Sequence, residues 1–255
     1  MKTWAVIANT FREAIRDKVL YNLVFFAMLV MGASVVIGNM TLGETIKIIL
    51  DLSLAAMSVF GLLIAIFVGI GLVHKEIQRR TLYMLLARPI SRRDFVIGKY
   101  LGLMLVIALN VAIMTAALLA LMALYSPGAM NWGIFVAVLL ILVELMVVTA
   151  VAVLFSTFST PTLSAMLTLG VWVIGRFSSD LVEFASKAED PVMRALVTFV
   201  HYVLPNLEKF DVKNLVVHNM AIEPAYVGGA VVYGLLYIVF LIGLATVIFE
   251  RRDFK

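Results

Sequence analysis

The chain has 255 residues, of which 63% are hydrophobic and only 14% are charged, and its formal net charge is +4. A soluble domain carries roughly 25% charged residues, so this chain has too few to cover a surface in water. Composition therefore excludes a soluble globular protein and predicts an all-α, multi-pass membrane protein, whose positive charge follows membrane topology rather than nucleic-acid binding. The chain contains no cysteine, which excludes disulfides and thiolate sites.

The first predicted element is an amphipathic helix over residues 3–18. Its apolar side chains recur at helical spacing, and charged residues take the opposite face. The apolar set is Trp4, Ile7, Ala8, Phe11, Ala14 and Ile15. Two interpretations stay open: residues 1–19 form an elbow helix in the cytoplasmic interface, or they extend the first span into the cytoplasm.

Six apolar stretches are long enough, or nearly so, to cross the hydrocarbon core, which takes about 20 residues of helix. They are Leu20–Ile37, Leu52–Val73, Val96–Tyr125, Gly133–Phe155, Pro161–Asp180 and Tyr226–Phe249. The fifth is the weakest, because its apolar part is short and contains Arg176. Residues 20–255 are thus expected to form one six-span domain.

The distribution of lysine and arginine predicts the orientation of these spans. Residues 1–19, 74–99 and 250–255 together hold 14 of the 20 basic residues. Because basic loops stay in the cytoplasm, both termini and the 74–99 loop are expected on the cytoplasmic side of a bacterial or archaeal plasma membrane. The segment 178–225 is then expected outside.

The basic loop 74–99 carries seven Lys or Arg against two acids. Residues 74–87 contain no proline or glycine and show helical periodicity, and Pro89 predicts the helix end. Ser91 to Asp94 match a capping pattern that starts the third span. A short helix followed by a reversal predicts a rigid projection that holds a partner. The alternative is that the basic residues serve only topology and lipid headgroups.

In the outer segment, Asp190 followed by Pro191 predicts a helix start. An apolar stripe then continues to Leu204-Pro205, where the helix is expected to end. The stripe consists of Val192, Ala195, Leu196, Phe199, Val200 and Val203. We expect it to pack on the outer ends of the spans, or otherwise on the lipid surface.

These patterns, with several short motifs, resemble the permease subunits of type-2 ATP-binding-cassette (ABC) exporters. The most similar group is the stand-alone permeases related to the nitrous-oxide-reductase copper maturation transporter. The resemblance covers the whole chain in architecture, but its specific motifs fall mostly in residues 75–102. They are Lys75-Glu76, Arg80-Thr81, Leu85-Leu86, Arg88-Pro89-Ile90-Ser91-Arg92, Phe95, Gly98-Lys99 and Leu101-Gly102, with support from Leu204-Pro205-Asn206-Leu207, Phe210 and Phe249-Glu250-Arg251-Arg252-Asp253.

The resemblance implies a six-span permease that forms a dimer and is driven by a separate cytoplasmic ABC ATPase. It implies that the elbow helix and the loop between the second and third spans contact that ATPase, and that short outer helices precede the last span. It does not identify the cargo. The residues expected to couple to the ATPase are Lys75, Glu76, Arg79, Arg80, Thr81, Arg88, Pro89, Ser91 and Arg92.

Glu144 and Arg176 are the charges placed furthest inside predicted spans. Counting from the cytoplasmic ends of consecutive antiparallel helices, both lie at a depth of roughly 18–21 Å. An unpaired charge near the bilayer centre costs at least about 2.5 kcal/mol. Similar depth favours an ion pair. The alternative is that Arg176 extends to the outer surface while Glu144 is protonated or faces a wet cavity.

No catalytic or cofactor site is expected, because P-loop, HExxH and GxSxG motifs are missing. Any ATP hydrolysis must then take place on another chain. His201, His218 and Met220 make an outer metal contact conceivable, but their spacing does not support it and packing roles are favoured. The main rival function is an ATP-independent channel or secondary transporter, for which only Glu144 and Arg176 are available. A membrane enzyme is the third alternative.

Overall fold

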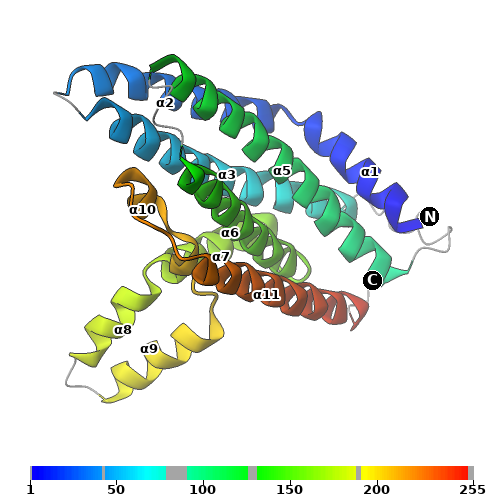
Figure 1. Cartoon of the computed structure of the whole chain (residues 1–255). Helices are drawn as coiled ribbons and strands as arrows, with labels where there is room; N and C mark the ends of the chain where they lie inside the picture. Colours follow the sequence, from blue (N-terminus) through cyan, green and yellow to red (C-terminus); the bar gives the residue numbers. More distant parts are fainter. Residues whose placement is uncertain (1, 42–43, 79–90, 126–130, 188–190, 252–255) are drawn as a thin grey trace.

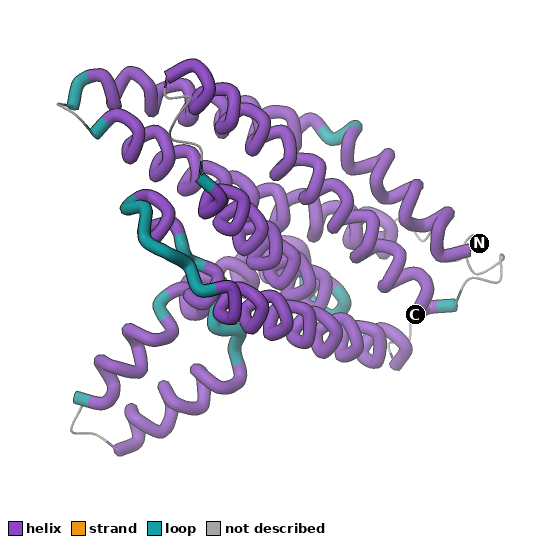
Figure 2. Tube along the Cα trace, viewed as in Figure 1, coloured by secondary structure: helices purple, strands orange, loops and turns teal. Residues whose placement is uncertain are grey.

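The computed structural model describes residues 2–41, 44–78, 91–125, 131–187 and 191–251. Within these ranges all regular secondary structure is helical, as the sequence predicts (Figures 1 and 2). The elements are α1 (Lys2–Ile15), α2 (Lys18–Asn39), α3 (Thr45–Gln78), α5 (Arg92–Tyr125), α6 (Trp132–Ser156), α7 (Pro161–Arg176), α8 (Ser178–Ser186), α9 (Pro191–Val203), η2 (Glu208–Phe210), α10 (Lys213–Val217) and α11 (Pro224–Arg251).

Among the described residues, five helices are long and apolar enough to cross a membrane: α2, α3, α5, α6 and α11. They correspond to the first four predicted spans and the last one. Helices α3 and α6 are the most buried of them and form the centre of the bundle, whereas α2 and α11 are the least buried and lie at its periphery. A sixth crossing exists if the bent pair α7–α8 counts as one span.

The fifth predicted span is wrong as a continuous helix over Pro161–Asp180. Helix α7 ends at Arg176, after 16 residues, and α8 continues at 62° to it. Helix α7 alone is about 24 Å long at 1.5 Å per residue, which is less than the roughly 30 Å of a hydrocarbon core.

Competing hydrogen bonds explain why α7 stops. In a continuous helix the carbonyl of Gly175 would accept from the amide of Ser179. Instead, Gly175 O accepts from the amide of Leu207 at 3.0 Å, and the Ser179 amide donates to Glu208 Oε2 at 3.2 Å. The backbone groups freed by the break are therefore satisfied by a segment some 30 residues further along the chain.

This segment, residues 204–217, enters the bundle rather than staying outside it. Pro205, Leu207 and Phe210 are buried, and Val212 and Val216 follow them inside. Phe210 lies beside Gly234 of α11, whereas Val216 lies beside Gly133 at the start of α6. We call residues 203–210, which run from the last residue of α9 to Phe210, the inserted segment, because Leu207 and Glu208 within it bond to the backbone where α7 ends.

The α8–α9 hairpin projects sideways from the bundle, on the side where α7 and α11 lie (Figure 1). Helix α9 starts at Pro191, as predicted. The expected packing of its apolar stripe on the outer ends of the spans is not found, since Val192 is 70% exposed and Phe199 67% exposed. The reason is the 62° bend, which directs the hairpin away from the bundle and leaves α9 to pack mainly against α8.

Helix α1 packs along the first turns of α5. Val6 contacts α5 at Gly98, and Thr10 contacts it at Gly102, where an added Cβ would lie only 2.6 Å from the Thr10 Cβ. The Gly98–Gly102 pair thus permits a close helix approach, and the neighbouring helix is α1. Asp17 then caps α2, its side chain accepting from the Val19 amide at 3.0 Å. The chain therefore starts a new helix here instead of extending α2 without interruption.

Candidate functional site

Glu144 is fully buried in the middle of α6. It lies 12 residues from each end of the helix, which places it about 18 Å from either end at 1.5 Å per residue. Only 1% of its side chain is exposed. A carboxylate in such a position needs charged or hydrogen-bonding partners, because an isolated buried charge is strongly unfavourable.

The last turn of α7 supplies those partners. Arg176 Nη1 lies 3.1 Å from Glu144 Oε1 and 3.2 Å from Oε2, and Trp172 Nε1 donates to Oε1 at 3.1 Å. Trp172 and Arg176 are four residues apart and so share one helix face. The structure thus brings Glu144 and Arg176 together, and it adds an indole donor that sequence reasoning missed.

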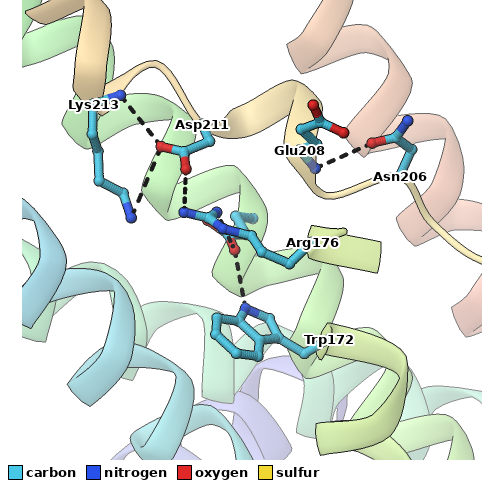
Figure 3. A network of polar contacts seen from close by, with 7 residues as sticks. Trp172, Arg176, Asn206, Glu208, Asp211 and Lys213 are labelled. Atoms are coloured by element: carbon cyan, nitrogen blue, oxygen red, sulfur yellow. Dashed lines mark hydrogen bonds and ion pairs between the residues drawn. The ribbon is translucent and has the colours of Figure 1, made fainter. Parts of the chain in front are cut away.

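Two further charges complete an ionic cluster, which we define as Glu144, Arg176, Asp211 and Lys213; the last three are labelled in Figure 3. Asp211 Oδ2 accepts from Arg176 Nη2, and Asp211 Oδ1 lies 3.9 Å from Lys213 Nζ. Burial and then the nearby Arg176 lower the pKa of Lys213, while Asp211 opposes them. With two acids and two bases the cluster is formally neutral.

Asp211 and Lys213 were not predicted as members, since residues 178–225 were expected to lie outside the membrane. Arg176 therefore has a second ionic partner, Asp211, in addition to Glu144. A signal was present in the sequence: apolar residues recur closely between Leu204 and Val217, which is unusual for a loop in water. This pattern is typical of a segment that packs into the bundle, which brings Asp211 and Lys213 close to Arg176.

The cluster joins three parts of the fold: α6 at its midpoint, α7 at its end, and the chain just after the inserted segment. Its buried atoms are engaged with one another, and it contains no nucleophile paired with a base, so its geometry suits mechanical fastening rather than acid–base chemistry. Helix α7 bends directly next to the cluster.

The histidines that raised a metal site are separated in the structure. His201 Nδ1 lies 2.7 Å from Ser178 Oγ, linking α9 to α8. His218 Nδ1 lies 2.9 Å from the carbonyl oxygen of Asn214, within its own turn. Among the described residues, no group of three or more His, Asp or Glu is arranged to hold a metal ion.

The predicted coupling residues fall mostly beyond the described ranges. Lys75 and Glu76 belong to the last turn of α3, which runs to Gln78 and so includes the beginning of the predicted 74–87 helix. Residues Arg79, Arg80, Thr81, Arg88 and Pro89, like the remainder of that helix, lie outside the described residues.

Ser91 and Arg92 are described, and they start α5 as the sequence predicts. Ser91 Oγ accepts from the Asp94 amide at 3.1 Å and donates to Asp94 Oδ2 at 2.7 Å, so the capping pattern is confirmed. Arg92 Nη1 donates to the carbonyl oxygen of Glu250 at 2.8 Å. In the same turn of α5, Asp94 Oδ1 accepts from Thr3 Oγ1 of α1 at 3.2 Å. The first turn of α5 is thereby fastened to α1 and to α11.

In a comparison with known protein families, the chain matches the family described as ABC-2 family transporter protein over residues 4–254. The match covers almost the entire chain. A search of curated proteins finds no match.

Proposed function

The chain belongs to the ABC-2 family of transporter proteins and is a multi-pass membrane component of a transport system, and we propose that it is the permease subunit of an ABC exporter. The family match over residues 4–254 is the observation that carries this proposal. In the proposed complex a separate cytoplasmic ATPase hydrolyses ATP, and the permease performs no chemistry of its own. We also propose that the chain is related to the stand-alone permeases like that of the nitrous-oxide-reductase copper maturation transporter.

In this proposal two copies of the chain form the export pathway in a bacterial or archaeal plasma membrane, with both termini in the cytoplasm. The common position of the chain ends supports the last point: Thr3 and Glu250 both contact the first turn of α5. Helix α1 acts as the elbow. Its contact with Gly98 and Gly102 of α5 supports this role. Helix α5 directly follows residues 79–90, which we call the coupling loop.

The ATPase docks, in our proposal, on residues 75–93. Helix α3 extends to Gln78, and α5 starts at Arg92 with a first turn capped by Ser91, so the proposed docking residues begin on one helix and end on the next. The seven basic residues of the 74–99 loop would favour a partner surface that is acidic.

Cysteine cross-linking tests the docking site directly, because the chain has no native cysteine. Single cysteines at Glu76, Arg80 and Ser91 should cross-link to the co-purifying ATPase. A cysteine at Lys187, which lies at the far end of α8, should not. Mass spectrometry of the cross-linked species gives the measurement. Absence of cross-links from all three inner positions in an intact complex would refute the docking proposal.

The rival function, an ATP-independent channel or secondary transporter, would use Glu144 and Arg176 to line a pathway. Their geometry favours the fastening role instead. Both side chains are engaged with each other, and Arg176 is only 14% exposed. A conducting pathway needs groups that are accessible to the moving ion.

A further inference from the structure

Helix α11 contacts two segments that lie far apart along the chain. Its C-terminal end meets the first turn of α5, directly after the coupling loop. Its N-terminal half meets the inserted segment, which directly follows the α8–α9 hairpin in the chain. The helix between these contacts is continuous from Pro224 to Arg251.

The cytoplasmic contact combines an ion pair with stacked aromatic rings. Arg93 Nε donates to Glu250 Oε1 at 2.6 Å, and Arg93 Nη2 donates to Glu250 Oε2 at 3.4 Å. The rings of Phe95 and Phe249 stack with centroids 5.6 Å apart and planes 16° apart. Phe249 is 1% exposed, so α11 cannot slide past α5 here without breaking a packed contact.

The outer contact is made by three tyrosines of α11. Tyr237 Oη donates to the carbonyl oxygen of Val203 at 2.6 Å, and Tyr233 Oη accepts from the Asn206 amide at 2.9 Å. Tyr226 Oη donates to the carbonyl oxygen of Lys209 at 2.9 Å. Spacings of seven and four residues place the three rings on one helix face. They hold the backbone of the inserted segment at its start, middle and end.

Through these contacts α11 forms a rigid connection between the first turn of α5 and the inserted segment. Tyr237 and Glu250 are separated by 13 residues, or about 20 Å of helix. Hydrogen-bonded helix resists stretching, so a displacement at one end reaches the other largely undiminished. The side of α11 that faces away from the bundle is exposed at Leu236, Val239 and Phe240.

We infer that α11 carries movement of the coupling loop to the inserted segment and thereby redirects the α8–α9 hairpin. This inference rests on the proposed coupling to an ATPase, and it assigns a positioning role to Glu250, Tyr233 and Tyr237. Such coupling is measured as a response at one site to a change imposed at the other.

A spin label at the hairpin tip measures that response. Ser186, the last residue of α8, is exposed, and Ser186→Cys would be the only cysteine of the chain. In the reconstituted complex with the ATPase, addition of MgATP should change the label's spectrum. The Glu250→Arg variant should lose this change, because a cation then faces Arg93. The Tyr233→Phe/Tyr237→Phe variant should lose it too, while ATP hydrolysis continues.

A matched control is Glu44→Gln, which breaks the exposed pair with Lys47 and does not touch α11; it should respond like the wild type. A full spectral change in both the Glu250→Arg and the tyrosine variant would contradict transmission through α11. So would a wild-type label whose spectrum does not change while MgATP is hydrolysed. If no ATPase binds the wild-type chain, the proposed function itself fails.

Discussion

Replacing Arg176 by glutamine is expected to lower the free energy of unfolding by about 3–5 kcal/mol, the range for removing one partner of a buried ion pair. The reason is what remains: Glu144, 1% exposed, would keep only the hydrogen bond from Trp172. Asp211 would also lose its guanidinium partner. Thermal unfolding in one detergent, compared with the wild type, provides the measurement.

Glu144→Gln is expected to be milder, because Arg176 keeps Asp211 and the glutamine carbonyl still accepts from Trp172. The double variant should lose less than the sum of the two single losses, since no stranded Glu144 carboxylate remains. As a control, Lys187→Gln breaks a solvent-exposed pair with Glu183 and should leave stability unchanged. Strictly additive losses would show that Glu144 and Arg176 act independently.

Replacing Gly175 by alanine is expected to destabilise the protein by about 1–3 kcal/mol, the usual range for overpacking. An added Cβ would lie 2.5 Å from the carbonyl oxygen of Pro205 and 3.0 Å from Leu207 Cγ. The carbonyl belongs to backbone that is itself bonded to its surroundings, so the clash must displace the inserted segment. Each kcal/mol corresponds to about 2–4 °C in Tm for a chain of this size.

Gly170 provides the matched control on the same helix. A Cβ added there has no atom within 4 Å. Because alanine favours helix over glycine by up to about 1 kcal/mol, Gly170→Ala should be neutral or stabilising. Equal effects at both positions would mean that the inserted segment does not press on the end of α7.

The features that could be predicted from sequence are those determined by local pattern. The thickness of a bilayer sets the length of an apolar run, so five of the long helices were predicted, four of them within four residues of their observed bounds. Pro191 and the Ser91–Asp94 cap each start a helix through contacts within one turn, and both starts were predicted. The shared depth of Glu144 and Arg176 followed from counting residues along two neighbouring helices.

The features that could not be predicted depend on residues far apart in the chain. Helix α7 stops because Leu207 and Glu208 take the hydrogen bonds that would have continued it, and nothing near Arg176 signals this. Asp211 reaches the cluster through the same long-range contacts, although the closely spaced apolar residues of 204–217 indicated that its segment packs into the bundle. The exposed face of α9 shows the converse limit: helical periodicity identifies an apolar face, but it does not say what covers that face.

The central claim, that this chain works with a separate ATPase, is tested most directly by MgATP hydrolysis in proteoliposomes. The preparation is the complex that co-purifies with the tagged chain, and the comparison is a chain in which residues 79–90 are replaced by a glycine–serine linker of equal length. The account predicts that an ABC ATPase co-purifies with the wild-type chain and that the linker variant abolishes binding or the permease-dependent part of hydrolysis. Absence of any such ATPase, or the same hydrolysis rate with either chain, would contradict it.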